Sequence, residues 1–451
     1  MRRYGENGRK GGVAMLRRKA LERFRFWKKN KSKQALLVTG ARQVGKTFLI
    51  REFLRVAYSS FVEFNLVDDD SARKTLANAE NASDLMLRIS VIADVPLVPH
   101  ETAIFFDEIQ ECPSIMRHIK QLIDAQEYDF ILSGSLLGVT LEGVDTLPGG
   151  YVTEVTMYPL DFEEFCWANG VASGVMTAVR QSFERTTEVP DFIHERLFTL
   201  WHRYLLIGGM PDAVRAYLDS GTIDQTRVVH SDIRKLYKRD ISQYAPKAER
   251  AVIQNIYDLI PSEITGSSRR FKLSSIEEVK RFSQVTNEFL WLKAANVALP
   301  TYAVTCPASP LLLTQKDNIF KLFMSDVGLL TSTFIKRGAA DLLDGKAGMN
   351  LGGVYENAVA QELAAHEFDL RYYNGKKVGE LDFVVETFDR RVIAFEVKSG
   401  NAYKTHTALD RALGKDGFGI DEAYVLAETN VERDGAVTYL PAYMVSMFHN
   451  Q

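Results

Sequence analysis

Gly40-Ala41-Arg42-Gln43-Val44-Gly45-Lys46-Thr47 decides the fold, because these eight residues form a complete G-x-x-x-x-G-K-T loop. An apolar strand-like run precedes the loop, and a helical pattern follows it. In this context backbone N–H groups and a helix N-terminus surround phosphates. We expect Lys46 to reach the β- and γ-phosphates of a nucleotide and the Thr47 hydroxyl to bind Mg²⁺. A glycine-rich turn that binds nothing is the less favoured alternative.

Two later apolar runs end in polar side chains. The first run leads to Asp107 and Glu108, and the second leads to Ser133 and Ser135. Beside a P-loop, Asp107 is expected to hold the Mg²⁺ shell and Glu108 to polarise the attacking water. Either serine is expected to sense the γ-phosphate, although a polar turn that closes a strand explains each of them equally well.

The pattern of apolar runs predicts an α/β fold. Strands are expected near residues 35–39, 61–66, 103–106 and 128–132, with helices between most of them. Strands that alternate with helices form a parallel sheet covered on both faces, and ligands bind at the carboxyl ends of its strands. The P-loop and Asp107-Glu108 both fall at such ends.

Six segments together resemble a prokaryotic AAA+-type ATPase family whose members carry a C-terminal domain of unknown function 4143. They are GARQVGKT at 40–47, FDEIQ at 106–110, LSGS at 132–135, YPLDFEEF at 158–165, GGMPDAV at 208–214 and FKLFMSDVGLL at 320–330. The resemblance runs from about Met15 to the end of the chain and implies ATP as the ligand. It implies a P-loop ATPase core over 15–158 and a helical lid over 159–246. It also implies that the turn at 208–211 lies near the nucleotide, whereas a helix C-cap followed by proline is an equally good structural explanation.

The chain departs from this family at one place. The family usually carries Gly-Arg before the Tyr-Pro-Leu segment, but no Arg or Lys occurs between Leu136 and Tyr158. AAA+ relatives use such an arginine, supplied by a neighbouring subunit, to stabilise charge on the γ-phosphate. Arg203, Arg215 or Arg239 is a candidate substitute for this arginine finger. If the finger comes from a neighbouring subunit, the protein must form a homo-oligomer.

Composition fits a globular protein of two or three domains. The chain has 451 residues, of which 46% are hydrophobic and 25% charged, with a net charge of −3. The cysteines at 112, 166 and 306 lack metal spacing and are expected to be small buried side chains. No apolar run is long enough to cross a bilayer and no signal-peptide core is present, so we expect a cytoplasmic protein without a membrane partner.

The N-terminal region is basic. Residues 1–14 are rich in glycine and charge and are expected to be disordered, and Met15 is a candidate start. Over 16–29, apolar residues recur at helical spacing with basic residues between them. This helix is expected to pack its aromatic side on the ATPase core, and phosphate binding by its basic side is the alternative.

Residues 247–335 are predicted to form a winged-helix-like middle domain. Helices are expected over 251–260, from 273 onward behind a Ser-x-x-Glu capping box, and over 286–292. The wing strands are expected at 297–304 and 318–323. Winged helices often bind DNA, but residues 283–296 contain only one cation, so a connector or oligomerisation module is an equal alternative.

Residues 336–451 contain a second set of chemically informative side chains. Glu380–Val385 and Val392–Lys398 read as a hairpin, which brings Asp382 beside Glu396 and Lys398, and a preceding helix presents Glu356. Glu, Asp and Glu-x-Lys in this order resemble the PD-(D/E)-x-K core of restriction-endonuclease-like domains. The resemblance implies that Glu356, Asp382 and Glu396 bind Mg²⁺ and that Lys398 is catalytic.

The sequence therefore predicts an ATP- and Mg²⁺-dependent ATPase whose nucleotide state gates a nuclease-like α/β domain, with DNA as a candidate substrate. The alternative is a nucleotide-switched scaffold or regulator that binds protein or nucleic acid without cleaving it.

Overall fold

The computed structural model describes residues 15–31, 33–135, 150–266, 269–276, 279, 281–334 and 351–450. Its N-terminal sheet has five strands in the order β2-β3-β4-β1-β5, and every neighbouring pair is parallel. The strands are β1 (Ala35–Thr39), β2 (Ser60–Asn65), β3 (Thr102–Asp107), β4 (Asp129–Ser133) and β5 (Val152–Thr156). The parallel sheet and its first four strands are confirmed, whereas β5 was not predicted.

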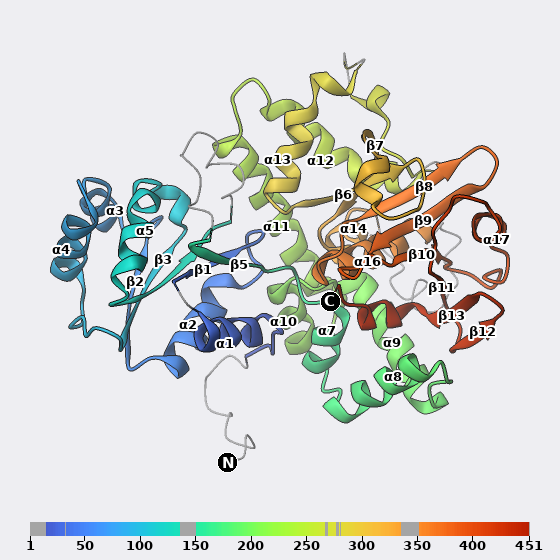
Figure 1. The fold of residues 1–451 in the computed structure, drawn as a ribbon, viewed down its shortest axis with the longest axis horizontal. Helices are drawn as coiled ribbons and strands as arrows, with labels where there is room; N and C mark the ends of the chain where they lie inside the picture. Colours follow the sequence, from blue (N-terminus) through green and yellow to red (C-terminus); the bar gives the residue numbers. More distant parts are fainter. Residues whose placement is uncertain are drawn as a thin grey trace.

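Helices cover both faces of this sheet (Figure 1). They are α1 (Ala20–Asn30), α2 (Lys46–Ala57), α3 (Asp70–Ala77), α4 (Ala82–Ile92), the short η1 (Ile109–Glu111) and α5 (Ser114–Ala125). Alternate residues of β1 point to opposite faces: Leu36 packs in the core that includes α1 and α2, and Leu37 in the core that includes α3 to α5. On α1, Phe24 and Trp27 are buried in the first of these cores, as predicted.

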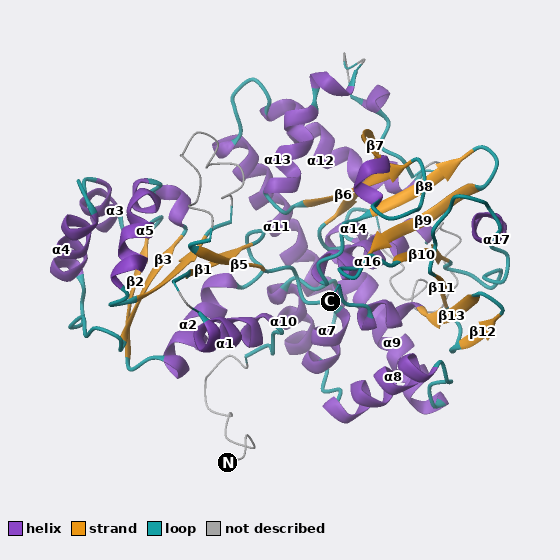
Figure 2. Ribbon diagram, viewed as in Figure 1, coloured by secondary structure: helices purple, strands orange, loops and turns teal. Residues whose placement is uncertain are grey.

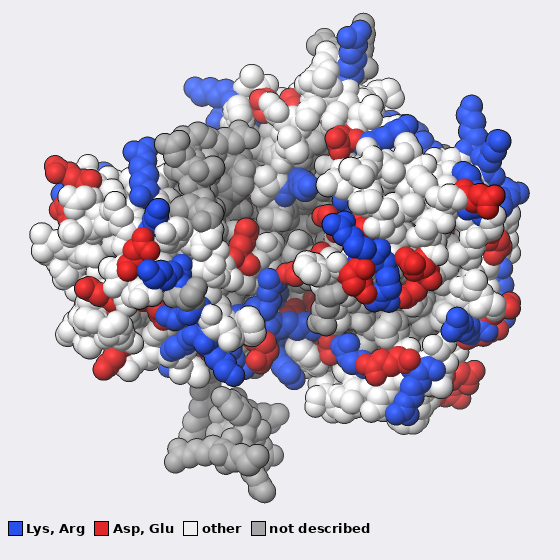
Figure 3. All heavy atoms as spheres, viewed as in Figure 1, with Lys and Arg blue, Asp and Glu red and all other residues white. Residues whose placement is uncertain are grey.

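Arg23, Arg25 and Lys29 of α1 are exposed. Figure 3 shows Lys and Arg side chains gathered around this helix, whereas basic and acidic residues are interspersed over much of the rest of that face. Residues 1–14 lie outside the described part of the chain.

A helical segment follows β5. It consists of α7 (Phe162–Ala168), α8 (Ser173–Arg185), α9 (Asp191–Ile207), α10 (Pro211–Ser220) and α11 (Ile223–Tyr244). Asp161 and Glu164 form a capping box at the start of α7. α9 ends at Ile207 and is followed by Gly208, which has φ +69°, and α10 starts at Pro211, so the predicted break between helices is confirmed.

The second sheet has eight strands in the order β12-β13-β11-β10-β9-β8-β6-β7 (Figure 2). The strands are β6 (Ala298–Val304), β7 (Gln315–Met324), β8 (Arg371–Gly375), β9 (Gly379–Glu386), β10 (Val392–Val397), β11 (Glu422–Ala427), β12 (Glu432–Asp434) and β13 (Val437–Pro441). Its helices are α12 (Arg250–Thr265), η2 (Leu273–Ser275), η3 (Phe282–Gln284), α13 (Thr286–Ala294), η4 (Leu311–Thr314), α14 (Val327–Thr331), α16 (Gly352–Ala365), α17 (Thr407–Leu413) and η5 (Ala442–Met447). The β9–β10 hairpin and the helix before it lie where they were predicted.

Two features of the predicted winged helix are wrong. β6 and β7 pair with each other, but β6 also pairs in parallel with β8, so both strands belong to the C-terminal sheet instead of a separate wing. The expected second helix is only the short η2 within the described residues, and Glu277 and Glu278 of the capping box lie outside them. Ser275 donates instead to Glu263 of α12, at 2.6 Å.

The Gly208-Gly209 turn joins three segments that are far apart in the sequence. Leu160 N donates to Gly209 O at 2.7 Å, and Gly209 N donates to Asp326 Oδ2 at 2.6 Å. A Cβ atom at Gly209 would lie 2.0 Å from Leu160 O, so only glycine fits there. The turn therefore fixes the start of α10 against both the ATPase core and the C-terminal part.

Among the described residues, no helix has the length and the apolar character that crossing a membrane would demand.

Candidate functional site

The loop between β1 and α2 has the backbone conformation that phosphate binding requires. Gly40 has φ +130°, and a Cβ atom there would lie 2.1 Å from Met157 O. Gly45 has φ +90° and immediately precedes α2. Both positions favour glycine because L side chains rarely adopt these conformations. The helix N-terminus and the loop amides therefore meet at the carboxyl end of β1.

Lys46 is buried at the centre of this loop. Its Nζ atom donates to Gly40 O and Ala41 O, both at 2.9 Å, and to Ser135 Oγ at 2.8 Å. Burial lowers the pKa of Lys46 to about 8, although the carboxylates of Glu108 and Asp107 oppose this effect. The ammonium thus lies among neutral oxygen atoms that a phosphate oxygen can replace.

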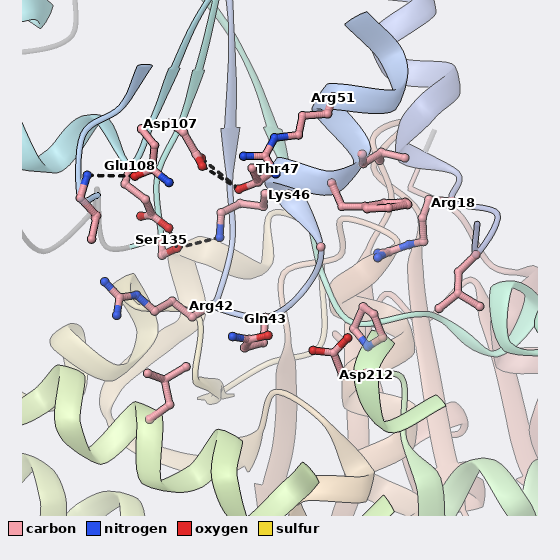
Figure 4. A pocket seen from close by; sticks show the side chains of 18 of the residues that line it. Arg18, Arg42, Gln43, Lys46, Thr47, Arg51, Asp107, Glu108, Ser135 and Asp212 are labelled. Atoms are coloured by element: carbon pink, nitrogen blue, oxygen red, sulfur yellow. Dashed lines mark hydrogen bonds between the residues drawn. The ribbon is translucent and has the colours of Figure 1, made fainter. Parts of the chain in front are cut away.

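Thr47 and Asp107 lie side by side, from α2 and the end of β3 (Figure 4). Thr47 Oγ1 is 3.0 Å from each carboxylate oxygen of Asp107, and Ser133 also donates to Asp107. Burial raises the pKa of Asp107, while the bond from Ser133 opposes that shift. A hydroxyl and a carboxylate are oxygen ligands that suit a Mg²⁺ ion shared with phosphates, so these residues fit that ion.

Glu108 follows Asp107 and adopts a left-handed conformation, with φ +55°. Ser135 Oγ donates to one of its carboxylate oxygens at 3.0 Å, and Gln110 Nε2 donates to the other at 2.5 Å. Burial favours a raised pKa, but the charge of Lys46, the bond from Gln110 and the charge of Arg42 together hold the pKa of Glu108 below its ordinary value. An ionised, oriented carboxylate is suited to positioning or deprotonating a water.

These side chains line a cavity of about 570 Å³. Its opposite wall comes from Leu16 and Arg18 before α1 and from Pro211, Asp212 and Arg215 of α10 (Figure 4). The turn at 208–211 therefore leads directly into the wall of the cavity. Arg18 donates to Val44 O of the loop at 2.8 Å and to Glu164 at 2.9 Å, so it also fixes the loop to α7.

Arg42 pairs with residues of α11. Its guanidinium donates to Asp240 at 2.8 Å and to Tyr244 Oη at 3.2 Å. Tyr237 Oη donates to the backbone carbonyl of Arg42 at 3.1 Å. Burial raises the pKa of Asp240 to about 6 in spite of Arg42. The side chain of Arg42 therefore connects the loop to the helical segment.

Of the three arginines proposed as substitutes for the missing finger, Arg215 lines the cavity. Its guanidinium lies over the ring of Phe48, 5.1 Å from the ring centre, and 3.7 Å from Asp212. Arg203 and Arg239 are not among the described residues that line it.

The predicted nuclease residues also come together. Glu356 from α16, Asp382 from β9 and Glu396 from β10 all interact with the buried Lys321 of β7 or with one another. Lys398 Nζ is 2.8 Å from Glu396 Oε1, so the Glu-x-Lys pair shares one face as predicted. Asp382 Oδ2 accepts from Val397 N at 2.8 Å. Burial and the charge of Asp382 raise the pKa of Glu396 to about 7.

The predicted Mg²⁺ site among these three carboxylates does not fit the structure. Within the described ranges, no three His, Cys, Asp or Glu side chains are arranged to hold a metal ion. Cationic side chains hold both oxygens of Glu356 and Oε1 of Glu396. The backbone N–H of Val397 donates to Asp382 Oδ2, and Glu396 Oε2 is buried without a hydrogen-bond partner.

Sequence reasoning missed several residues of both sites. Arg18, Gln110 and Asp240 contact the P-loop or Glu108, and Lys321 lies among the C-terminal carboxylates. Gln110 and Lys321 both stand inside segments that resemble the ATPase family, at 106–110 and 320–330, and those segments were the available signal for them. The prediction for the cysteines holds for Cys112 and Cys166, which are buried, but Cys306 is only half-buried.

Comparison with known families agrees with the P-loop assignment. Residues 32–166 match an AAA domain, residues 198–339 match domain of unknown function 8612, and residues 351–443 match domain of unknown function 4143. The chain thus contains an AAA-type ATPase domain, which supports ATP binding. The predicted resemblance is confirmed for the AAA domain and for domain of unknown function 4143. No functionally curated protein matches the chain.

Solved structures with similar segments have low sequence identity. A Walker-type ATPase of Pyrococcus abyssi is 16% identical, with 70% of this chain and 95% of that chain covered and a TM-score of 0.41. The Orc1 protein of Aeropyrum pernix, solved in complex with DNA, is 11% identical, with 74% and 93% covered and a TM-score of 0.28. AMPPCP-bound DnaA from Aquifex aeolicus is 12% identical, with 62% and 89% covered and a TM-score of 0.29.

Proposed function

We propose that the protein binds ATP with Mg²⁺, hydrolyses it, and uses its nucleotide state to regulate a C-terminal domain that does not cleave nucleic acid. The observation that carries the ATPase is the arrangement of Lys46, Thr47, Asp107 and Glu108 around one cavity. Lys46 provides a cation for the phosphates, and Thr47 and Asp107 hold the Mg²⁺ ion. That ion supplies neutralisation of phosphate charge when bound.

Glu108 provides the general base. Ser135 and Gln110 hold its two oxygens, and its lowered pKa keeps it ionised near neutral pH. When phosphates take the ammonium of Lys46, Ser135 loses the donor that now reaches its hydroxyl. The hydroxyl bonded to Glu108 therefore responds to nucleotide, which links occupancy of the cavity to the orientation of the base.

Hydrogen bonds support coupling between the P-loop and the C-terminal domain. Arg18 joins Val44 O to Glu164, whose backbone N–H donates to Asp161 at 2.8 Å. Asp161 Oδ2 lies 3.1 Å from Nε2 of His366, which follows α16 directly. Since α16 also carries Glu356, a movement of the loop has a short bonded route to the C-terminal side chains.

Nuclease action on DNA is the second candidate function. The convergence of Glu356, Asp382, Glu396 and Lys398 favours it. The buried Lys321 among these carboxylates weighs against it, and for that reason we prefer the regulator.

Two variants test the ATPase. Lys46→Ala should abolish ATP binding, whereas Glu108→Gln should keep ATP affinity and lose turnover, because Lys46 contacts phosphate and Glu108 acts on water. ATP affinity and turnover are measured separately, with Lys235→Ala as a control for an exposed lysine. Equal ATP affinity in Lys46→Ala and the wild type would refute the assignment.

Hydrogen exchange tests the regulation. ATP added to Glu108→Gln should change exchange in α11 and α16, and the same addition to Lys46→Ala should change neither. Exchange that responds to ATP only within the ATPase core would contradict coupling. Plasmid nicking with Mg²⁺ or Mn²⁺ that disappears in Asp382→Ala would instead establish the nuclease.

A further inference from the structure

Lys321 lies at the centre of the C-terminal carboxylates. Its side chain is completely buried, and Nζ is 2.8 Å from Glu380, 3.1 Å from Glu356 and 3.7 Å from Asp382. An ammonium group has three N–H donors, and here three carboxylates surround it. Its Nζ also lies over the ring of Tyr372, 5.2 Å from the ring centre.

We propose that the ammonium of Lys321 permanently occupies the position of the divalent cation in this nuclease-like centre, so that the C-terminal domain does not take up metal. The lysine comes from β7, outside the Glu, Asp and Glu-x-Lys residues that resemble a nuclease core. It reaches them because β7 and β6 extend the sheet that contains β8, β9 and β10. α16 lies against this end of the sheet and supplies Glu356.

The charges of the described cluster balance without a metal. It contains four carboxylates and four cationic side chains: Glu356, Glu380, Asp382 and Glu396, with Lys321, Arg269, Arg270 and Lys398. Arg269 pairs with Glu356, and Lys398 pairs with Glu396. A divalent ion would add two positive charges to a neutral group whose central members, Lys321 and Glu356, are fully buried, and this is costly in a low-dielectric environment.

Metal geometry adds a second obstacle. Mg²⁺ requires oxygen ligands at about 2.0–2.1 Å in near-octahedral arrangement. Glu356 uses one oxygen for Arg269 and the other for Lys321, and Asp382 uses one oxygen for the backbone N–H of Val397. Binding would first have to break these interactions and expel a fully buried ammonium.

Substitution of the lysine tests the assignment in the full-length protein. Lys321→Met removes the charge and keeps a long side chain, so three carboxylates lose their shared cation. Mn²⁺ binding to nucleotide-free protein is measured from the electron paramagnetic resonance signal of free Mn²⁺. Lys321→Met should bind one more equivalent of Mn²⁺ than the wild type, and Asp382→Asn in the same background should remove it. Lys235→Met, at an exposed ion pair, is the matched control and should equal the wild type.

Two results would overturn the proposal. The first is a wild-type protein that binds a Mn²⁺ ion which Asp382→Asn removes, because the position would then be open to metal. The second is a folded Lys321→Met protein that gains no Mn²⁺. If Lys321→Met fails to fold, the comparison of wild type with Asp382→Asn decides, and equal Mn²⁺ stoichiometry is the supporting result. ATP turnover is not part of this readout. A failure of the proposal for Lys321 can therefore be distinguished from a failure of the proposed ATPase function.

Discussion

ATP affinity should fall as pH rises through the titration of Lys46. Burial lowers the pKa of Lys46 to about 8. Phosphates beside the ammonium favour its charged form, so the pKa in the complex is expected at or above the ordinary lysine value of about 10.4. A group whose pKa rises when ATP binds strengthens ATP binding fully at pH values below its pKa in the free protein. That contribution is lost progressively as the pH rises above the pKa in the free protein. The sensitive window therefore begins near pH 8 and extends upward.

The size of the effect follows from the fraction of charged lysine. With a free pKa of about 8, the ammonium is about 90% charged near pH 7 and about 10% charged near pH 9. ATP affinity should therefore weaken roughly tenfold between these conditions, which corresponds to about 1.4 kcal/mol. Phosphate ionisation does not interfere, because its second pKa is near 6.

Isothermal titration calorimetry with a non-hydrolysable ATP analogue provides the assay. In buffers of different ionisation enthalpy, about one proton should be taken up per nucleotide near pH 9 and about 0.1 near pH 7. Glu108→Gln sharpens the test, because the Glu108 carboxylate raises the pKa of Lys46. In that variant the loss of affinity should begin at a lower pH. Constant affinity and no proton uptake between pH 7 and 9 would refute the reasoning.

Three further outcomes follow from the described contacts. Gly209→Ala places a methyl group 2.0 Å from Leu160 O and should lower the free energy of unfolding by about 1–3 kcal/mol or more. Gly174→Ala meets open space and should not lower it, and urea unfolding measures both variants. Arg215→Ala should reduce ATP turnover at least about tenfold with little change in affinity, and Arg203→Ala should leave both near wild type; equal turnover in the two variants would exclude Arg215 as the substitute arginine. If a neighbouring subunit supplies the finger instead, specific activity should rise with protein concentration, and a constant rate from a demonstrated monomer would count against that source.

The ATPase half was predictable from sequence because its signals are local. Continuous apolar runs followed by glycines or acidic residues predict β1, β3 and β4, and these runs place Lys46 and Asp107 at one edge of the sheet. β5 was missed because Val152–Thr156 contains only two apolar residues, lies at a sheet edge and carries no motif. Arg18 was missed as a site residue because its partners are 26 and 146 positions away.

In the C-terminal half the hairpin was predicted correctly, whereas the place of β6 and β7 in the sheet, and with it Lys321 among the carboxylates, was not. Assigning β6 and β7 to a separate wing leaves Lys321 on a solvent-facing strand, where a lysine is unremarkable. Only the pairing of β6 with β8 carries that lysine into the carboxylate cluster. Sheet membership of this kind depends on long-range pairing, which strand propensity and period do not specify.

Strand β7 connects the C-terminal carboxylate cluster to the Gly208-Gly209 turn beside the P-loop cavity over a short distance. Lys321 lies on β7, and Asp326, which accepts from Gly209 N, follows the same strand five positions later. At about 3.3 Å per residue in extended chain, the two residues are at most about 17 Å apart along the backbone. A partner that shifts β7 near Lys321 therefore also moves the turn that leads to Asp212 and Arg215. Linkage between binding events is reciprocal. If a ligand of the C-terminal domain favours one position of β7 and thereby changes the affinity for ATP by some factor, ATP changes the affinity for that ligand by the same factor.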